Sequence, residues 1–292
     1  MLWYLADINR PTQQTPNVTI QNQRPIQPWS AMLATESGAK QNFHQLQLEF
    51  TRRFSNGLGA QAEYQWTRSL TNADEVGGPQ IPAFPNLDYG NTSYVARHQL
   101  VFNYIYELPV GRGRHWWANL NSVAERFLGG WQLTGITTYR TGTPFTVNFQ
   151  VPSSFVGWWG GRADRVPGSK LYAGRQTGHN VISGVQWFNP GAFAPPPPWN
   201  WGNSSPFSVW GPGMWDWDMS VGKSFHLPIR GLEASQLQFR ADFFDAFNHF
   251  NLANPSNTIG DTRDGGPTVP TAGKIFDGTG NRIIQIGLSL YF

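Results

Sequence analysis

The final stretch of the chain, residues 282–292, constrains the fold more than any other. Its side chains alternate strictly, and one side of the predicted strand carries only large apolar groups, namely Ile284, Ile286, Leu288, Leu290 and Phe292. Such a row would make the edge of a soluble sheet prone to aggregation, whereas a membrane strand needs it to face lipid. The stretch also has the roughly 9 to 11 residues of a tilted membrane strand. A soluble sandwich strand with one face on the core is the alternative.

Composition favours a β protein with long loops. Charged residues make up only 13% of the 292 residues, well below the quarter that is typical of soluble domains, while aromatic residues reach 15% and glycine and proline are plentiful. The basic residues are scattered and the net charge is only +3, so no nucleic-acid partner is expected. The absence of cysteine excludes disulfides, thiolate metal sites and cysteine nucleophiles.

The chain has no apolar run of the length that a transmembrane helix needs. Its first residues, MLWYLADINR, do not have the basic region and apolar core of a secretory signal peptide. For an outer-membrane protein, the missing signal peptide leads us to expect a C-terminal fragment of a longer chain.

Alternation of apolar and polar side chains recurs along the sequence and predicts further strands. The Asn56-Gly57 pair is a strong hairpin signal, because both turn positions need a positive φ. The strands predicted in this way span residues 44–52, 58–67, 97–108, 130–140, 214–225, 236–247 and 282–292. A shorter strand at 29–36, a strand extension at 144–149 and a helical turn or two within 119–128 are also expected. Residues 1–28 are interpreted as a loop or as the remnant of preceding structure.

The connections between these strands alternate in length. Residues 55–57 and 227–235 are short, 109–129 is intermediate, and the long connections are 68–96, 141–213 and 249–281. Outer-membrane barrels have this asymmetry, with short periplasmic turns and long extracellular loops. A soluble sandwich has no reason to maintain it, so the pattern favours a membrane barrel in the outer membrane.

The contrast between the two faces is sharpest in residues 214–225, where Asp216 and Asp218 alternate with Trp215 and Trp217. Two carboxylates would be costly in the core of a sandwich, but they suit a watery lumen behind an aromatic belt. Residues 236–247 place further polar groups on the corresponding face. The predicted lumen-facing charges are therefore Asp216, Asp218, Arg240 and Asp242.

A series of short motifs, in order, resembles the barrel of TonB-dependent outer-membrane transporters of the Oar-like subgroup. The motifs are QNFHQLQ at 41–47, RRFSNGL at 52–58, ARH at 96–98, YELP at 106–109, GGWQLTG at 129–135, GTPFTV at 142–147, WFNP at 187–190, LQFRADFF at 237–244 and FNH at 247–249. The resemblance covers residues 41–292. It implies a barrel of about 22 strands with an N-terminal plug and a periplasmic TonB box. Neither of these two parts is recognised in this sequence.

The predicted fold is therefore all-β, with antiparallel transmembrane β-barrel strands that form a partial barrel of about 7 to 9 strands with long extracellular loops. Residues 1–40 are interpreted as the polar remnant of a preceding barrel strand or loop, and 41–292 as the C-terminal part of the barrel. The expected partners are outer-membrane lipid, the barrel-assembly machinery through the C-terminal strand, and TonB only through an N-terminal part outside this chain.

Candidate sites are few. The Trp-rich connection could stack sugars or aromatic solutes, and its ligand-contact candidates are Trp158, Trp159, Trp199 and Trp201; the alternative is a loop that packs on itself or plugs the mouth. The six histidines show no ligand spacing, and Asp261, Asp264 and Asp277 fit turn chemistry better than a calcium loop. No catalytic set can be assembled. We expect no enzyme activity, no metal and no cofactor.

The sequence thus predicts the barrel wall and extracellular loops of a TonB-dependent receptor for energised solute uptake. Two alternatives stay open at this point. One is a small passive outer-membrane pore or adhesin, which a closed barrel of about eight strands would permit. The other is a secreted, aromatic-rich, carbohydrate-binding β domain.

Overall fold

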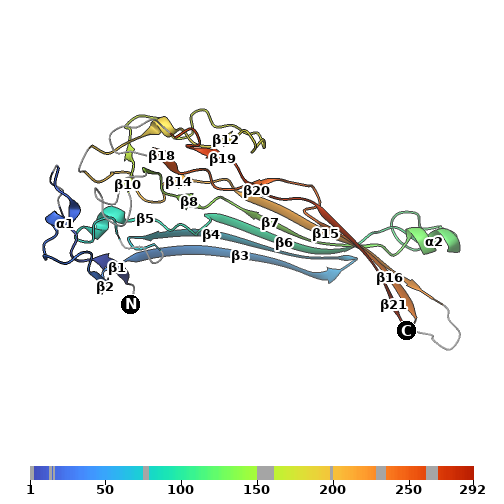
Figure 1. Cartoon of the computed structure of the whole chain (residues 1–292). Coiled ribbons are helices and arrows are strands. Elements are labelled where there is room, and N and C mark those ends of the chain that lie inside the picture. The colour runs from blue at the N-terminus through green and yellow to red at the C-terminus, as the bar shows by residue number, and fades with distance from the viewer. Residues whose placement is uncertain are drawn as a thin grey trace.

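One large antiparallel sheet dominates the computed structural model of the chain (Figure 1). The structure describes residues 3–12, 15, 17–74, 79–149, 161–197, 200–227, 235–260 and 269–292. Seven long strands follow one another in sequence order across the sheet: β3 (Gln41–Ser55), β4 (Leu58–Thr71), β6 (His98–Glu107), β7 (Gln132–Arg140), β15 (Met214–His226), β16 (Gln236–Phe244) and β21 (Ile283–Tyr291). The short β5 (Gly90–Asn91) extends the sheet beside β4.

The sheet is open, with β3 and β21 at its two edges. Within the described part of the chain, neither edge strand has a partner on its outer side. Because seven strands alternate in direction between the edges, β3 and β21 run the same way. An antiparallel closure therefore requires an odd number of further strands. A partial barrel of antiparallel strands fits this arrangement.

The seven predicted strands are all present, and the hairpin turn has the expected geometry. Asn56 and Gly57 both adopt positive φ, at 53° and 80°, which is the backbone that a tight turn matched to the strand twist needs. The short α2 (Ser122–Leu128) lies within the predicted helical segment, and Asn121 caps it by accepting a hydrogen bond from the Ala124 amide. The shorter predicted strand contains β2 (Leu33–Glu36).

Three predictions about local structure were wrong. Strand β16 ends at Phe244 rather than at residue 247, because Asp245 turns the chain with φ of 47°. Residues 144–149 do not extend β7 but form two separate short strands, β8 (Pro144–Phe145) and β9 (Asn148–Phe149). The segment interpreted as a loop contains β1 (Tyr4–Asp7), which pairs with β2, and the short helix α1 (Ile20–Gln23).

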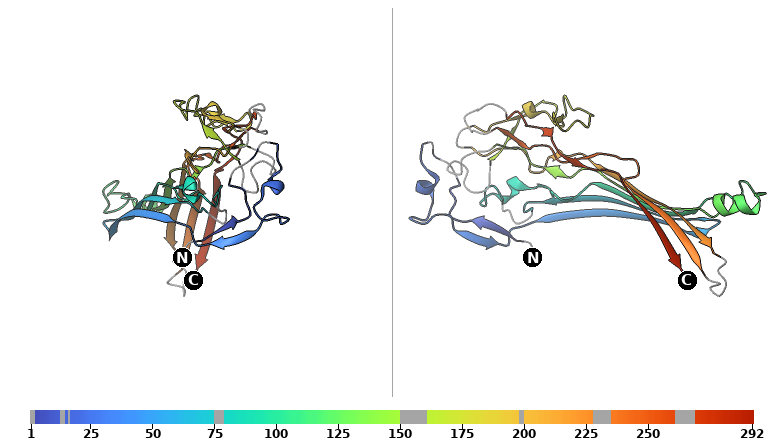
Figure 2. Two further views of the ribbon diagram at one scale, coloured as in Figure 1. Left: turned by 90° about the vertical axis from the view of Figure 1, so that its left-hand side faces the viewer. Right: turned by 45° about the vertical axis from the view of Figure 1, so that its right-hand side comes forward.

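The two ends of the sheet differ, as the connection lengths predict. The long connections fold together into a loop module, defined as the described residues between β4 and β6, β7 and β15, and β16 and β21 (Figure 2). Besides β5, β8 and β9, it contains η1 (Pro85–Asp88), β10 (Gly161–Arg162), β11 (Asp164–Arg165), β12 (Val185–Gln186), η2 (Pro190–Ala192), β13 (Phe193–Ala194), β14 (Val209–Trp210), β17 (Asn251–Leu252), β18 (Thr258–Gly260), β19 (Lys274–Ile275) and β20 (Gly278–Thr279).

The loop module has its own apolar core. Val147, Phe188, Val209, Ile259 and Ile275 are all at most 3% exposed and belong to one buried cluster. These residues come from the connections on both sides of the β15–β16 hairpin. The long loops are therefore a packed unit rather than separate excursions.

The strand register separates the side chains of the sheet into two faces. Leu48, Tyr64, Leu100, Tyr139 and Trp215 lie side by side on five neighbouring strands, in one row of the apolar face. On β21 the apolar row is strongly exposed, with Ile286 at 70% and Leu288 at 66%. Lipid facing this side would satisfy the row. No described helix is long and apolar enough to cross a bilayer.

Candidate functional site

The four predicted lumen-facing charges lie on the polar face of the sheet. Register places Asp242 of β16 opposite Ser220 of β15, on the same face as Asp216 and Asp218. The Nε atom of Arg240 lies 2.7 Å from a carboxylate oxygen of Asp242 and 3.1 Å from the Ser220 hydroxyl. The Asp218 carboxylate accepts a hydrogen bond from the Asp245 amide at 3.0 Å. On this face Arg240 and Asp242 are therefore paired, and a backbone amide holds Asp218.

A hollow of about 650 Å³ lies over this face. One row of side chains crosses its floor from β3 to β15, with the polar Thr51, Gln61, Asn103 and Asp218 and the apolar Ile136. Arg240 and Asp242 also line it. The hollow has the volume of a small-molecule site, and its lining combines these polar and charged groups with apolar side chains such as Phe54, Ile105 and Phe244.

A second hollow, of about 570 Å³, lies in the loop module. Asp88 and Arg162 line it together with asparagines and the rings of Tyr94 and Phe207. Arg162 pairs with Asp88, with 2.9 Å between Nη1 and Oδ1, and donates from Nη2 to the Leu87 carbonyl at 3.2 Å. Burial raises the pKa of Asp88 and lowers that of Arg162, although the two charges attract. The hollow combines hydrogen-bonding groups with ring surfaces.

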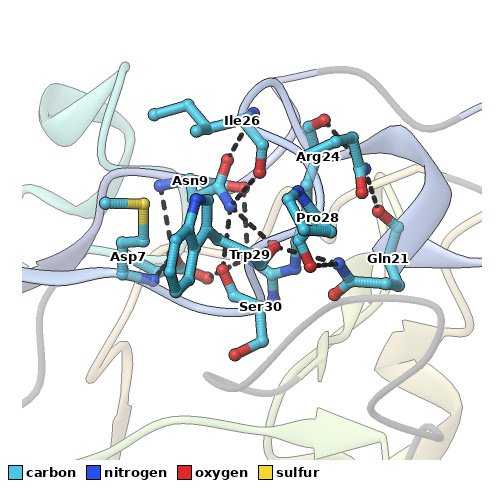
Figure 3. A network of polar contacts seen from close by, with 10 residues as sticks. Asp7, Asn9, Gln21, Arg24, Ile26, Pro28, Trp29 and Ser30 are labelled. Atoms are coloured by element: carbon cyan, nitrogen blue, oxygen red, sulfur yellow. Dashed lines mark hydrogen bonds and ion pairs between the residues drawn. The ribbon is translucent and has the colours of Figure 1, made fainter.

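Beside this hollow, residues 7–30, the N-terminal segment, form a buried polar cluster. Arg24 pairs with Asp7 at 2.7 Å, and the fully buried Asn9 side chain donates to the carbonyls of Ile26, Trp29 and Ser30 (Figure 3). A buried asparagine that satisfies three carbonyls fixes the course of an otherwise irregular segment. The cluster thereby positions the neighbouring Arg10.

Arg10 joins the N-terminal segment to the loop module. Its guanidinium carbon lies 4.4 Å from the centre of the Trp201 ring, and the residue is only 5% exposed. Its three guanidinium nitrogens have no hydrogen-bond partner among the described residues. Burial lowers the pKa of Arg10 to about 10, against the attraction of Asp7 and Asp88.

Of the four tryptophans predicted to contact a ligand, only one lies within the described residues. Trp158, Trp159 and Trp199 lie outside the described residues. Trp201 is in place and stacks under Arg10 rather than standing open for a ligand. Of the aspartates weighed for calcium, Asp261 and Asp264 also lie outside the described residues. Across the described ranges, no group of three or more histidine, aspartate or glutamate side chains could hold a metal ion.

Sequence reasoning missed the buried charges at positions 10, 24, 88 and 162. They are far apart in the chain, and no spacing rule connects them. It also missed the approach of His179 to His249, whose ring centres are 6.2 Å apart.

An open antiparallel sheet with an exposed apolar face, an opposite polar face and long loops at one end defines a β-barrel protein of the outer membrane. The chain belongs to the outer membrane beta barrel domain family, whose model matches residues 1–285. This membership places the protein in the outer membrane. No curated protein matches the chain in sequence.

Proposed function

We propose that this chain forms the barrel wall and extracellular loops of a TonB-dependent outer-membrane receptor that takes up a solute with energy input. The ordered motifs that resemble the Oar-like subgroup support this proposal. In this function the sheet supplies wall and lumen, and the loop module supplies solute contacts. The chain carries out no chemical reaction.

The packed loop module is the observation that carries the proposal. A passive pore needs an open mouth, whereas a receptor needs an ordered surface that recognises a solute before passage. Here the long connections share a buried core, hold the buried Arg162–Asp88 pair and surround a polar hollow of about 570 Å³. These features favour a receptor over a passive pore.

The proposal also assigns partners. Outer-membrane lipid contacts the apolar face, and the barrel-assembly machinery engages the C-terminal strand through the row that ends at Phe292, which is 85% exposed. TonB acts through a plug and TonB box supplied by an N-terminal part outside residues 1–292. We expect no nucleic-acid partner.

The family membership bears differently on the two alternative functions, a secreted carbohydrate-binding domain and a passive pore or adhesin. A secreted carbohydrate-binding domain does not agree with membership of an outer-membrane barrel family. A passive pore or adhesin remains the competing function, and it differs from the receptor in one measurable respect. Receptor-driven uptake requires an energised inner membrane, whereas diffusion through a pore does not.

The test compares cells that carry the gene with a strain from which it is deleted. Both strains are given a panel of radiolabelled siderophores, oligosaccharides and peptides, with and without a protonophore. We expect at least one solute to accumulate only in the parent strain, and this accumulation to stop when the protonophore is added. Gene-dependent entry that continues at the same rate with the protonophore would indicate a passive pore.

A matched pair of variants separates recognition from folding. Tyr94→Ala removes a ring that lines the loop hollow and is 64% exposed, and Ser183→Ala truncates an exposed side chain of the same module that the hollow does not include. We expect the first to raise the solute concentration needed for half-maximal uptake and the second to leave it unchanged. Equal effects would argue against solute contact at the hollow.

A further inference from the structure

The connection between β6 and β7 carries an exposed apolar surface at the end of the sheet opposite the loop module. Figure 1 shows α2 projecting from this end, where the C-terminus also lies, and the right-hand view of Figure 2 shows the same placement. The apolar side chains of the connection are strongly exposed: Trp116 55%, Trp117 62%, Val123 69%, Phe127 63% and Leu128 43%. Packing within the described residues does not cover these five side chains.

The connection is ordered by its own hydrogen bonds. The Trp116 amide donates to the Pro109 carbonyl at 2.9 Å, and the Gly111 amide donates to the Trp116 carbonyl at 3.0 Å. The Glu125 carboxylate accepts a hydrogen bond from the Arg112 amide at 2.6 Å. The exposed rings are therefore presented by a fixed scaffold.

Two side chains, Trp131 just before β7 and Lys223 of β15, attach α2 to the apolar face of the sheet. The Trp131 indole donates to the Phe127 carbonyl at 2.8 Å, and the Lys223 ammonium donates to the carbonyl of Gly129, the residue that caps the helix. Lys223 is 6% exposed, and its ammonium lies 5.7 Å from the Trp131 ring centre and 5.0 Å from that of Phe225.

These contacts set the depth of α2 relative to the bilayer. Tryptophan, phenylalanine and a lysine gathered at one end of a lipid-facing surface have the composition of an interfacial belt. A helix held by the belt lies at headgroup level. Val123 and Phe127, four positions apart, share one side of it.

We propose that residues 109–131, the interface segment, form an amphipathic anchor in the periplasmic leaflet of the outer membrane. Its occupant is phospholipid. The apolar side chains continue the lipid-facing surface of the sheet beyond the strand ends. Arg112, Arg114 and Arg126 face two acidic side chains, Glu125 of the segment and Glu107 of β6, which pairs with Arg114 at 3.0 Å, and the remaining positive charge suits anionic headgroups. Apolar area combined with basic residues is what binds interfacial helices to membranes.

Single-cysteine labelling tests the proposal directly, because the chain contains no cysteine. The full chain carrying Phe127→Cys is labelled with an environment-sensitive fluorophore in outer membranes from the producing cells, and a nitroxide phospholipid is added as quencher. We expect strong quenching and a blue-shifted emission. Ser122→Cys, on the other side of α2, is the matched control and should be quenched less.

Two further cysteine positions serve as references for lipid and for water. Ile286→Cys reports the lipid face of the sheet, and Ile182→Cys, at a position 94% exposed in the loop module, reports water. Quenching at 127 and 286 but not at 182 supports the anchor. Quenching at 286 alone, or equal quenching at 122 and 127, overturns it. Absence of quenching at both 127 and 286 overturns both the anchor and the lipid contact of the sheet.

Discussion

Arg162 and Asp88 form an ion pair inside the loop module, with Nη1 2.9 Å from Oδ1 and side chains only 9% and 12% exposed. Burying two charges is costly, and their attraction does not always repay the cost. The pKa of Asp88 shows this balance, because burial raises it above 3.8 even with Arg162 beside it. The pair therefore makes the stability of the loops depend on pH in a direction that can be worked out.

The first prediction concerns that pH dependence. Because the pKa of Asp88 is higher in the folded loops than in the unfolded chain, the folded state binds its proton more readily. The stability from this group is fully present below pH 3.8 and is lost as the pH rises through the raised pKa. Hydrogen exchange in the loop module should show this trend in wild type and not in Asp88→Asn. A stabilisation that increases with pH and disappears in the variant would mean that attraction outweighs burial.

The second prediction compares two buried arginines. Arg10 has a depressed pKa of about 10 and no hydrogen-bond partner among the described residues, whereas Arg24 pairs with Asp7. Arg10→Met should stabilise the N-terminal segment by about 1–2 kcal/mol, after allowance for the lost contact with Trp201. Arg24→Met should destabilise it by about 3 kcal/mol, because Asp7 stays buried without its cation. Exchange of the β1 amides measures both, and changes of the same sign would refute the distinction.

The third prediction concerns the lipid face of β21. Ile286→Arg should destabilise the inserted protein by about 2–4 kcal/mol, because the charge would lie in the hydrocarbon region. Gln285→Arg, one position away on the polar face beside Asp242, should cost under about 1 kcal/mol. Urea unfolding from bilayers gives both values. Ile286 is 70% exposed, so a soluble protein would tolerate both changes alike.

The fourth prediction concerns two tyrosines of β6. The Trp217 indole donates to the Tyr104 hydroxyl at 3.1 Å, while the Tyr106 hydroxyl has no hydrogen bond to the described residues. Tyr104→Phe should cost about 1–2 kcal/mol, because the indole N–H loses its partner on the lipid side. Tyr106→Phe should change the unfolding free energy little. Equal costs would show that the hydrogen bond contributes nothing.

The fifth prediction concerns the hairpin turn between β3 and β4. Gly57→Ala should destabilise the hairpin by about 1–2 kcal/mol, because its φ of 80° is unfavourable for any residue with a Cβ. Gly59→Ala, in the following strand, meets only ordinary contacts at 3.4 Å and should be nearly neutral. Refolding yield and urea midpoints distinguish them.

The long strands were predictable because their contacts are local. Period-two alternation marks each of them, and every main strand pairs with its sequence neighbour, so the order of the sheet follows from the order of the chain. The end of β16 was misjudged because Asp245 breaks the strand inside an apolar pattern that continues to Phe247. Its amide binds the Asp218 carboxylate, a contact that no local rule contains.

Local alternation did not predict the contacts within the loop module or the pairing of β1 with β2. Strand β1 has four residues and pairs with β2 across an irregular segment that Asn9 holds through three carbonyls. The partners Arg162 and Asp88 are brought together only when two long connections pack. Such contacts depend on tertiary structure, whereas the polar face, with Asp216, Asp218, Arg240 and Asp242, could be predicted from alternation alone.

The core of the loop module joins connections from both sides of the β15–β16 hairpin, with Val147 before the hairpin and Ile275 after it. It therefore cross-links the outer ends of β7, β15, β16 and β21, across the three junctions between these strands. At this end of the sheet, β7 and β21 cannot separate without exposing the buried apolar cluster to solvent. The described residues at the short-connection end share no such apolar core, so the outer rim is the more strongly cross-linked end of the wall.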